Sequence, residues 1–158
     1  MPDISQARVP GLLRRLATMT YDLMLLCGVI FVAAALFIVP VLALTGSEEI
    51  SGLPQLALQL YLLAVVVVYY VYFWTGGRQT LGMRAWRTLL LRADGEPLTM
   101  VDALRRLAFA TLTLAPAGLG LWWVPLDRDG LSWYDRLSRT RPVLTARPGR
   151  AKTAAGGA

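Results

Sequence analysis

The 158-residue sequence contains no histidine and a single cysteine. The absence of histidine excludes His-based metal sites and His-based acid–base catalysis. The lone Cys27 excludes an intramolecular disulfide bond. No Ser, Cys or Lys has a base partner that can be recognised in the sequence, so nucleophilic catalysis has no support. We therefore expect no enzyme activity, no cofactor and no bound metal.

Charge is also scarce: charged residues make up 16% of the chain and apolar residues 56%, with a mean hydropathy of +0.51. A soluble domain of this size needs more polar surface, so the composition indicates an integral membrane protein. The formal net charge is +6. A basic balance is typical of nucleic-acid binding or of contact with an anionic membrane. In so apolar a chain we expect the lipid bilayer, with anionic phospholipid at the basic face, and no nucleic acid.

Two long uncharged runs predict two membrane-spanning helices. The twenty-five residues between Asp22 and Glu48 carry no charge, and at about 1.5 Å per residue they exceed the roughly 30 Å of a hydrocarbon core. We place the first span at about 23–44 and the second, in the uncharged run 50–77, at about 55–75. A secretory signal is the alternative for the first run, but the run is longer than an h-region of about 7 to 15 residues and a second hydrophobic segment follows it.

A third uncharged run, residues 107–126, is interrupted by Pro116, Gly118 and Gly120. It predicts either a re-entrant hairpin or a third span. Residues 1–21 and 78–106 have an excess of arginine over acids, as does the tail after residue 126. Because such excess marks cytoplasmic segments, we expect a cytoplasmic N-terminus and favour the hairpin, which also returns the C-terminus to the cytoplasm.

The expected fold is thus an all-α integral membrane domain over residues 1–145, with cytoplasmic amphipathic segments. Residues 75–91 read as a loop and a short amphipathic segment on the bilayer surface, and 89–97 allow a small β-ribbon around an Asp-Gly turn. Thr99 and Asp102 form a capping-box pattern, and Asp102 is spaced to pair with Arg105 or Arg106. Residues 146–158 lack large apolar side chains, so we expect a disordered tail.

Asp22 stands out because a carboxylate at the mouth of a spanning helix costs several kcal/mol unless it is paired or hydrated. Arg15 lies two turns earlier on the same face, about 10 Å away along the axis. We therefore expect both side chains to face a shared third partner, for which the candidates are Asp135, Arg136, Arg105 and Arg106. The alternative is a helix-entry acid that water and the helix dipole satisfy.

Two further motifs are incomplete. The glycines of residues 77–84 have phosphate-loop spacing, but Met83 and Arg84 stand where Lys and Ser or Thr are required. Residues 127–130 are similar to the start of a calcium loop without its terminal Glu. We expect neither a nucleotide site nor a metal site.

Three segments together resemble the RDD family: Arg-Arg-Leu-Ala at 14–17 with Asp22, Gly-Arg-Gln-Thr-Leu-Gly-Met-Arg at 77–84, and Trp-Tyr-Asp-Arg-Leu at 133–137 with Thr140. The resemblance covers roughly residues 8–145. It implies that Arg15 is the family arginine and that Asp22 and Asp135 are its two aspartates. Where the family often has Lys and His, this chain has Met83 and Tyr134. Supporting candidates on the cytoplasmic face are Arg84, Arg105, Arg106 and Thr140.

The resemblance implies a multi-pass protein of the bacterial inner membrane, in a family for which transport, including cation/proton exchange, is suggested. One hypothesis is a transporter subunit in which Asp22 and Asp135, held by Arg15, bind a cation or proton. Two spans are too few to enclose a path, so it requires a homo-oligomer, with close helix approach at Gly28 and 33–35. The alternative is a non-transporting scaffold in which the cluster is structural and the arginine-rich face binds anionic lipid or a partner protein.

Overall fold

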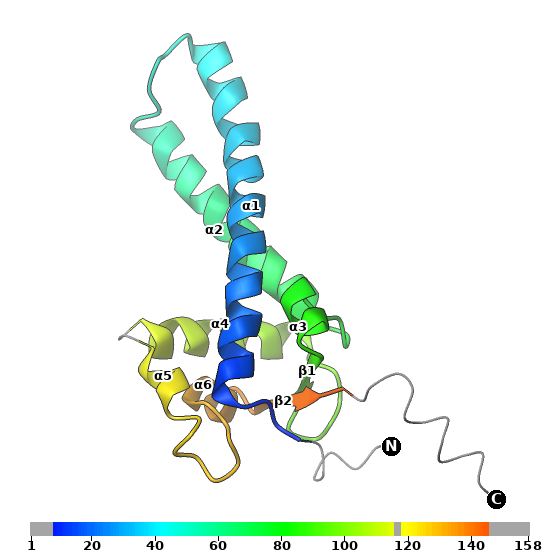
Figure 1. Ribbon diagram of the computed structural model, residues 1–158. Helices are drawn as coiled ribbons and strands as arrows, with labels where there is room; N and C mark the ends of the chain where they lie inside the picture. Colours follow the sequence, from blue (N-terminus) through cyan, green and yellow to red (C-terminus); the bar gives the residue numbers. More distant parts are fainter. Residues whose placement is uncertain (1–7, 116–117, 146–158) are drawn as a thin grey trace, which may run out of the picture.

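The computed structural model describes residues 8–115 and 118–145. Two long helices, α1 (Leu12–Thr45) and α2 (Leu53–Trp74), form an antiparallel pair that projects from a compact end (Figure 1). Within the described residues, these are the two helices long and apolar enough to cross a membrane. The prediction of two spanning helices is confirmed at this level. The expected disordered tail, 146–158, lies outside the described residues.

Helix α1 begins eleven residues before the predicted span. Its 34 residues extend about 50 Å at 1.5 Å per residue, which exceeds a hydrocarbon core of roughly 30 Å. The first turns, which carry Arg15, therefore reach beyond the apolar part. The helix ends at Thr45 and is capped by Gly46, whose φ of 63° is the left-handed conformation typical of a helix C-terminus. Pro54 lies in the first turn of α2, where its missing N–H costs nothing.

The other elements gather at the end of the pair where α1 begins and α2 ends (Figure 1). They are two strands, β1 (Thr88–Arg92) and β2 (Thr140–Leu144), and four helices, α3 (Leu81–Ala85), α4 (Met100–Leu114), α5 (Leu119–Trp122) and α6 (Trp133–Leu137). A buried cluster of Trp74, Leu90, Leu98 and Ala103 joins α2 to β1 and α4. A second cluster, Ala110, Leu121, Val124 and Tyr134, joins α4 to α5 and α6.

The two strands pair antiparallel, with Leu90 opposite Pro142, so the expectation of an all-α chain is wrong in this detail. The turn predicted in 89–97 does form, since Gly95 N–H donates to the carbonyl of Arg92 at 3.0 Å. The strand that pairs with β1, however, comes from much later in the chain. The side chain of Leu90 is almost fully buried, and this burial favours the long-range pairing.

The third apolar run does not form a helix of spanning length in the part of the chain that the structure describes. Helix α4 has 15 residues and runs across the line of α1 (Figure 1), and α5 has only four. Gly118, with a φ of 73°, donates its N–H to the carbonyl of Leu114 as the chain turns. The later segments return to the start of α1, where Leu144 N–H donates to the carbonyl of Arg8 at 2.9 Å. Both ends of the described chain therefore lie together.

Candidate functional site

Helix α6 begins with a reciprocal capping box. Asp135 N–H donates to Ser132 Oγ at 3.3 Å, and Ser132 N–H donates to Asp135 Oδ2 at 3.0 Å. The Thr99–Asp102 box that the sequence predicts at α4 forms in the same way. The box at α6 is not among the predictions from the sequence, although its Ser-x-x-Asp spacing is that of the Thr99–Asp102 box. It fixes the Asp135 carboxylate at the first turn of α6.

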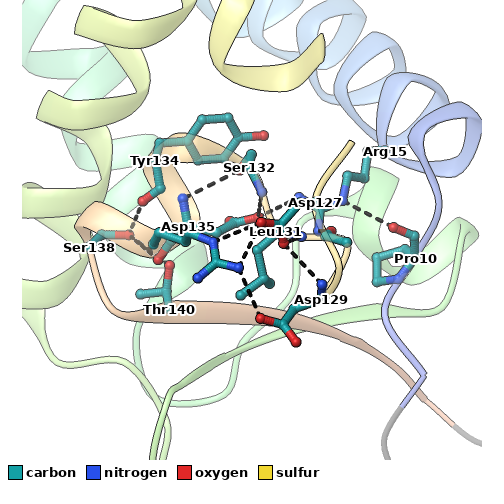
Figure 2. A network of polar contacts seen from close by, with 12 residues as sticks. Pro10, Arg15, Asp127, Asp129, Leu131, Ser132, Tyr134, Asp135, Ser138 and Thr140 are labelled. Carbon is teal, nitrogen blue, oxygen red and sulfur yellow. Dashed lines mark hydrogen bonds and ion pairs between the residues drawn. The ribbon is translucent and has the colours of Figure 1, made fainter. Parts of the chain in front are cut away.

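Two arginines from distant helices converge on this carboxylate. Arg15, from α1, forms an ion pair through Nη1 with Oδ2, and Arg106, from α4, pairs through Nη1 with Oδ1 at 2.6 Å. Arg15 also donates to the carbonyl oxygens of Pro10, at 3.1 Å, and Gly130, at 2.8 Å; the Pro10 bond and the carboxylate cluster are seen in Figure 2. We call the three charged residues the Arg15–Asp135–Arg106 clasp. It joins the start of α1 to α4 and α6.

Asp135 has an exposed fraction of 0%. Burial acts to raise its pKa, but the charges of Arg106 and Arg15, with hydrogen bonds from Arg15 and Ser132, outweigh burial and leave the pKa lowered. The carboxylate is therefore ionised at neutral pH. Because chain donors already occupy both of its oxygens, Asp135 has little capacity to take up a cation or a proton.

Arg106 has a second set of contacts. It donates to Thr140 Oγ1, and its guanidinium lies over the rings of Tyr134, at 4.9 Å, and Trp74, at 5.4 Å. Its Nε has no hydrogen-bond partner within the described residues. Arg106 and Thr140, two of the supporting candidates from the sequence, thus belong to the clasp and its immediate surroundings.

Asp22 lies in a different environment. Its Oδ2 accepts from the Thr80 hydroxyl at 2.7 Å and its Oδ1 from Gly82 N–H at 3.0 Å. No ion pair of Asp22 occurs among the described residues. The expected shared third partner of Arg15 and Asp22 is therefore not found. Asp22 holds α3 against α1, whereas Asp135 holds Arg15.

Gly82 makes this arrangement possible. A Cβ atom at this position would lie 2.5 Å from the Thr18 carbonyl oxygen and 2.6 Å from Asp22 Oδ1. Any larger residue would force α3 away from α1. The segment that has phosphate-loop spacing in the sequence thus provides a close helix approach and a hydroxyl for Asp22.

A cavity of about 400 Å³ lies where α1, α2 and α4 meet. Its polar walls include Arg15, Thr18, Asp22 and Arg106, and its apolar walls include Val66, Tyr70, Trp74, Leu107, Leu114 and Tyr134. The volume is in the range of small-molecule sites, which are mostly apolar with a few polar groups. Asp22 and the two arginines of the clasp therefore border the same cavity, although Asp22 forms no ion pair with either arginine.

The model of the RDD family matches residues 9–139, most of the chain. The chain belongs to the RDD family. No curated protein and no solved structure matches it. The resemblance inferred from the three sequence segments is thereby confirmed.

The remaining candidate residues of this RDD protein lie at its surface. Arg84 and Arg105 are exposed, and the Arg105 guanidinium lies 5.7 Å from the ring of Phe109. Arg136 pairs with Asp127 at 2.7 Å and with Asp129 at 2.9 Å, away from Asp22.

Asp102 pairs with Arg92 at 3.7 Å instead of the predicted Arg105 or Arg106. The hydrogen bond from the Thr99 hydroxyl is the main cause that lowers the pKa of Asp102. Among the described residues, no three Cys, Asp or Glu side chains gather closely enough to hold a metal ion.

Proposed function

We propose that this RDD-family membrane protein is a subunit of a cation or proton transporter in which Asp22 is the exchanging group and the Arg15–Asp135–Arg106 clasp is structural. The proposal narrows the sequence hypothesis, in which both aspartates bind the ion. One observation carries it: two arginines occupy Asp135, whereas Asp22 has only uncharged donors and borders the cavity.

The environment of Asp22 supports an exchange role on physical grounds. An ionisable side chain in a spanning helix is expensive, and such residues face cavities and mark ion or proton pathways. Asp22 is 5% exposed. A carboxylate has about four acceptor sites, and the two hydrogen bonds from Thr80 and Gly82 leave capacity for a proton or a small cation.

A single copy has too few helices to enclose a path, so the proposal includes a homo-oligomer. A shallow groove on the spanning pair is lined by Leu25, Gly28, Val29, Val32, Ala33, Leu36, Tyr61 and Val65. A Cβ at Gly28 would meet nothing within 4 Å, so a neighbouring helix has room to approach. We place the protein in the bacterial inner membrane. Both ends of the chain are placed in the cytoplasm, because the arginine-rich segments belong to the compact end and an excess of arginine marks the cytoplasmic side.

The test is ion flux in proteoliposomes that contain the full chain, measured with an internal pH dye under imposed Na⁺, K⁺ and pH gradients. We expect Asp22→Asn to abolish flux while the protein still folds, because the amide oxygen can accept from Gly82 N–H and the amide nitrogen can donate to the Thr80 hydroxyl oxygen. The matched control is Asp94→Asn, which changes an exposed acid and should leave flux unchanged. Flux that Asp22→Asn does not alter would refute the assignment.

The second candidate function is a non-transporting membrane scaffold. Two observations favour it: the clasp holds the later segments to α1, and the compact end carries exposed arginines, among them Arg14, Arg84, Arg87 and Arg105. Each cation near an anionic surface contributes about 1 kcal/mol of attraction. This surface would bind anionic phospholipid or an acidic partner protein. A well-folded chain that gives no flux under any gradient, yet binds anionic vesicles, would support this candidate over transport.

A further inference from the structure

We propose that the cavity between α1, α2 and α4 binds the headgroup of an anionic phospholipid taken from the surrounding bilayer, with the phosphate near Arg106. This site is separate from the exposed arginines of the surface. It does not depend on transport, because it concerns Arg106 and the cavity walls and not exchange at Asp22.

The shape and lining of the cavity suit a headgroup whose tails remain outside. Its volume of about 400 Å³ is in the lower part of the range for ligand sites, roughly 300–1,000 Å³, and is too small for a whole two-tailed lipid. Two residues of its lining, Leu23 on α1 and Thr111 on α4, are exposed on the surface of the chain. The exposed apolar side chain of Leu23 provides an apolar margin along which acyl chains can leave toward the bilayer.

Arg106 supplies the charge complementarity. Arg15 and Arg106 share the single carboxylate of Asp135, so the clasp retains one net positive charge. Arg106 is 6% exposed and borders the cavity. A phosphate in the cavity would balance this charge.

Asp22 is the group on the cavity wall that opposes an anion. Its two oxygens are directed to Thr80 and Gly82 of the α3 segment, which leaves Arg106 as the donor for the headgroup. Like charges repel in a low-dielectric cavity. The proposal therefore predicts that Asp22→Asn tightens the binding of the phospholipid, the opposite of its predicted effect on flux.

The experiment uses the full chain, stripped of lipid in a neutral detergent and titrated with phosphatidylglycerol or phosphatidylcholine, with bound lipid counted by native mass spectrometry. We expect one phosphatidylglycerol to be retained per chain and phosphatidylcholine to be lost. Arg106→Gln disturbs the clasp, so the decisive variants alter the exposed edge of the cavity. Leu23→Trp and Thr111→Trp should weaken phosphatidylglycerol binding about tenfold or more, a change of about 1.4 kcal/mol.

The neighbouring residues provide matched controls. Met24 and Leu112 are 71% and 69% exposed and do not line the cavity, so Met24→Trp and Leu112→Trp should bind as the unaltered protein does. An excess of inorganic phosphate should not displace the lipid, because the acyl chains contribute to binding. Equal retention in Leu23→Trp and Met24→Trp, equal retention of phosphatidylcholine, or displacement by phosphate alone would overturn the proposal. Loss of flux in Asp22→Asn with lipid binding intact would separate this site from the transport function.

Discussion

The spanning pair α1 and α2 and the compact end are stabilised by different kinds of contact. Along the spanning pair, almost nothing is buried within the chain, and the visible contacts are apolar or aromatic, such as the stacked rings of Phe37 and Tyr61. At the other end, charged and hydroxyl side chains are buried and hydrogen-bonded to partners far along the sequence. Lipid covers the first region, while the second must satisfy its own polar groups.

This contrast indicates where a substitution should change the stability of the protein most. Apolar side chains that face lipid exchange one apolar contact for another, so changes there are mild. A buried ion pair that loses one partner leaves an uncompensated charge, so changes there are severe. The predictions below set a change at the polar end beside a matched change elsewhere.

The largest effect is expected from Asp135→Ala. Removal of the carboxylate leaves Arg15 and Arg106 buried without an anion, at a cost of about 3–5 kcal/mol. The measurement is unfolding in mixed micelles titrated with SDS and followed by circular dichroism. Asp129→Ala removes an exposed acid and should leave the transition nearly unchanged. Similar transitions for the two variants would mean that the clasp does not stabilise the fold.

Acid should open the same contact without mutation. The pKa of Asp135 is lowered from 3.8 in the folded chain, so its contribution to stability is fully present above about pH 4 and is lost as the pH falls through the lower folded pKa. We expect limited proteolysis to release the segment around α6 as the pH falls below 4. The increase in proteolysis between neutral pH and pH below 4 should be smaller in Asp135→Asn, because this side chain cannot ionise. An unchanged acid profile in that variant would assign the effect to other carboxylates.

Two glycine substitutions should change the free energy of unfolding by intermediate amounts and in different directions. Gly82→Ala places a methyl group against Thr18 and Asp22 and should destabilise the protein by about 1–3 kcal/mol. Gly28→Ala meets nothing in the chain, so in the dissociated single chain it should be neutral or stabilise the fold by up to about 1 kcal/mol through helix propensity. SDS titration measures both. If Gly28→Ala destabilised the protein more than Gly82→Ala, the close helix contact would not lie at Gly82.

The smallest effect concerns a cap. Thr99→Ala removes the hydroxyl that accepts from Asp102 N–H and should cost about 1 kcal/mol. Thr45→Ala, at the far end of α1, removes an exposed bond to the Val41 carbonyl and should change stability by less than about 0.5 kcal/mol. Proteolysis between α3 and α4 should increase in the first variant alone; equal cleavage in both would show that the cap has no special role.

The sequence predicts the apolar part of the fold well because length and hydropathy determine a spanning helix locally. Both spans, the helix-start pattern at Thr99 and the family motifs follow from neighbouring residues. The pairing of β1 with β2 does not, because the strands are far apart and each is only five residues long.

The candidate site divides in the same way. The family motifs single out Arg15, Asp22 and Asp135, but spacing along one helix cannot show which partner each one meets. Asp22 finds a hydroxyl and a backbone N–H on α3 because Gly82 allows close approach, a feature of tertiary geometry. The preference of Arg106 over Arg105 for Asp135 depends on which face of α4 turns toward α6, which the sequence alone leaves undetermined.

Arg15 and Asp135 are 120 residues apart, so their contact sets an order of events during synthesis. The arginine leaves the ribosome long before its carboxylate partner, and a nascent helix α1 must therefore insert with an unneutralised guanidinium at its base. A chain that stopped before α6 would lack the one carboxylate that pairs with both Arg15 and Arg106, so the compact end could not neutralise these two charges until the last segment has been made.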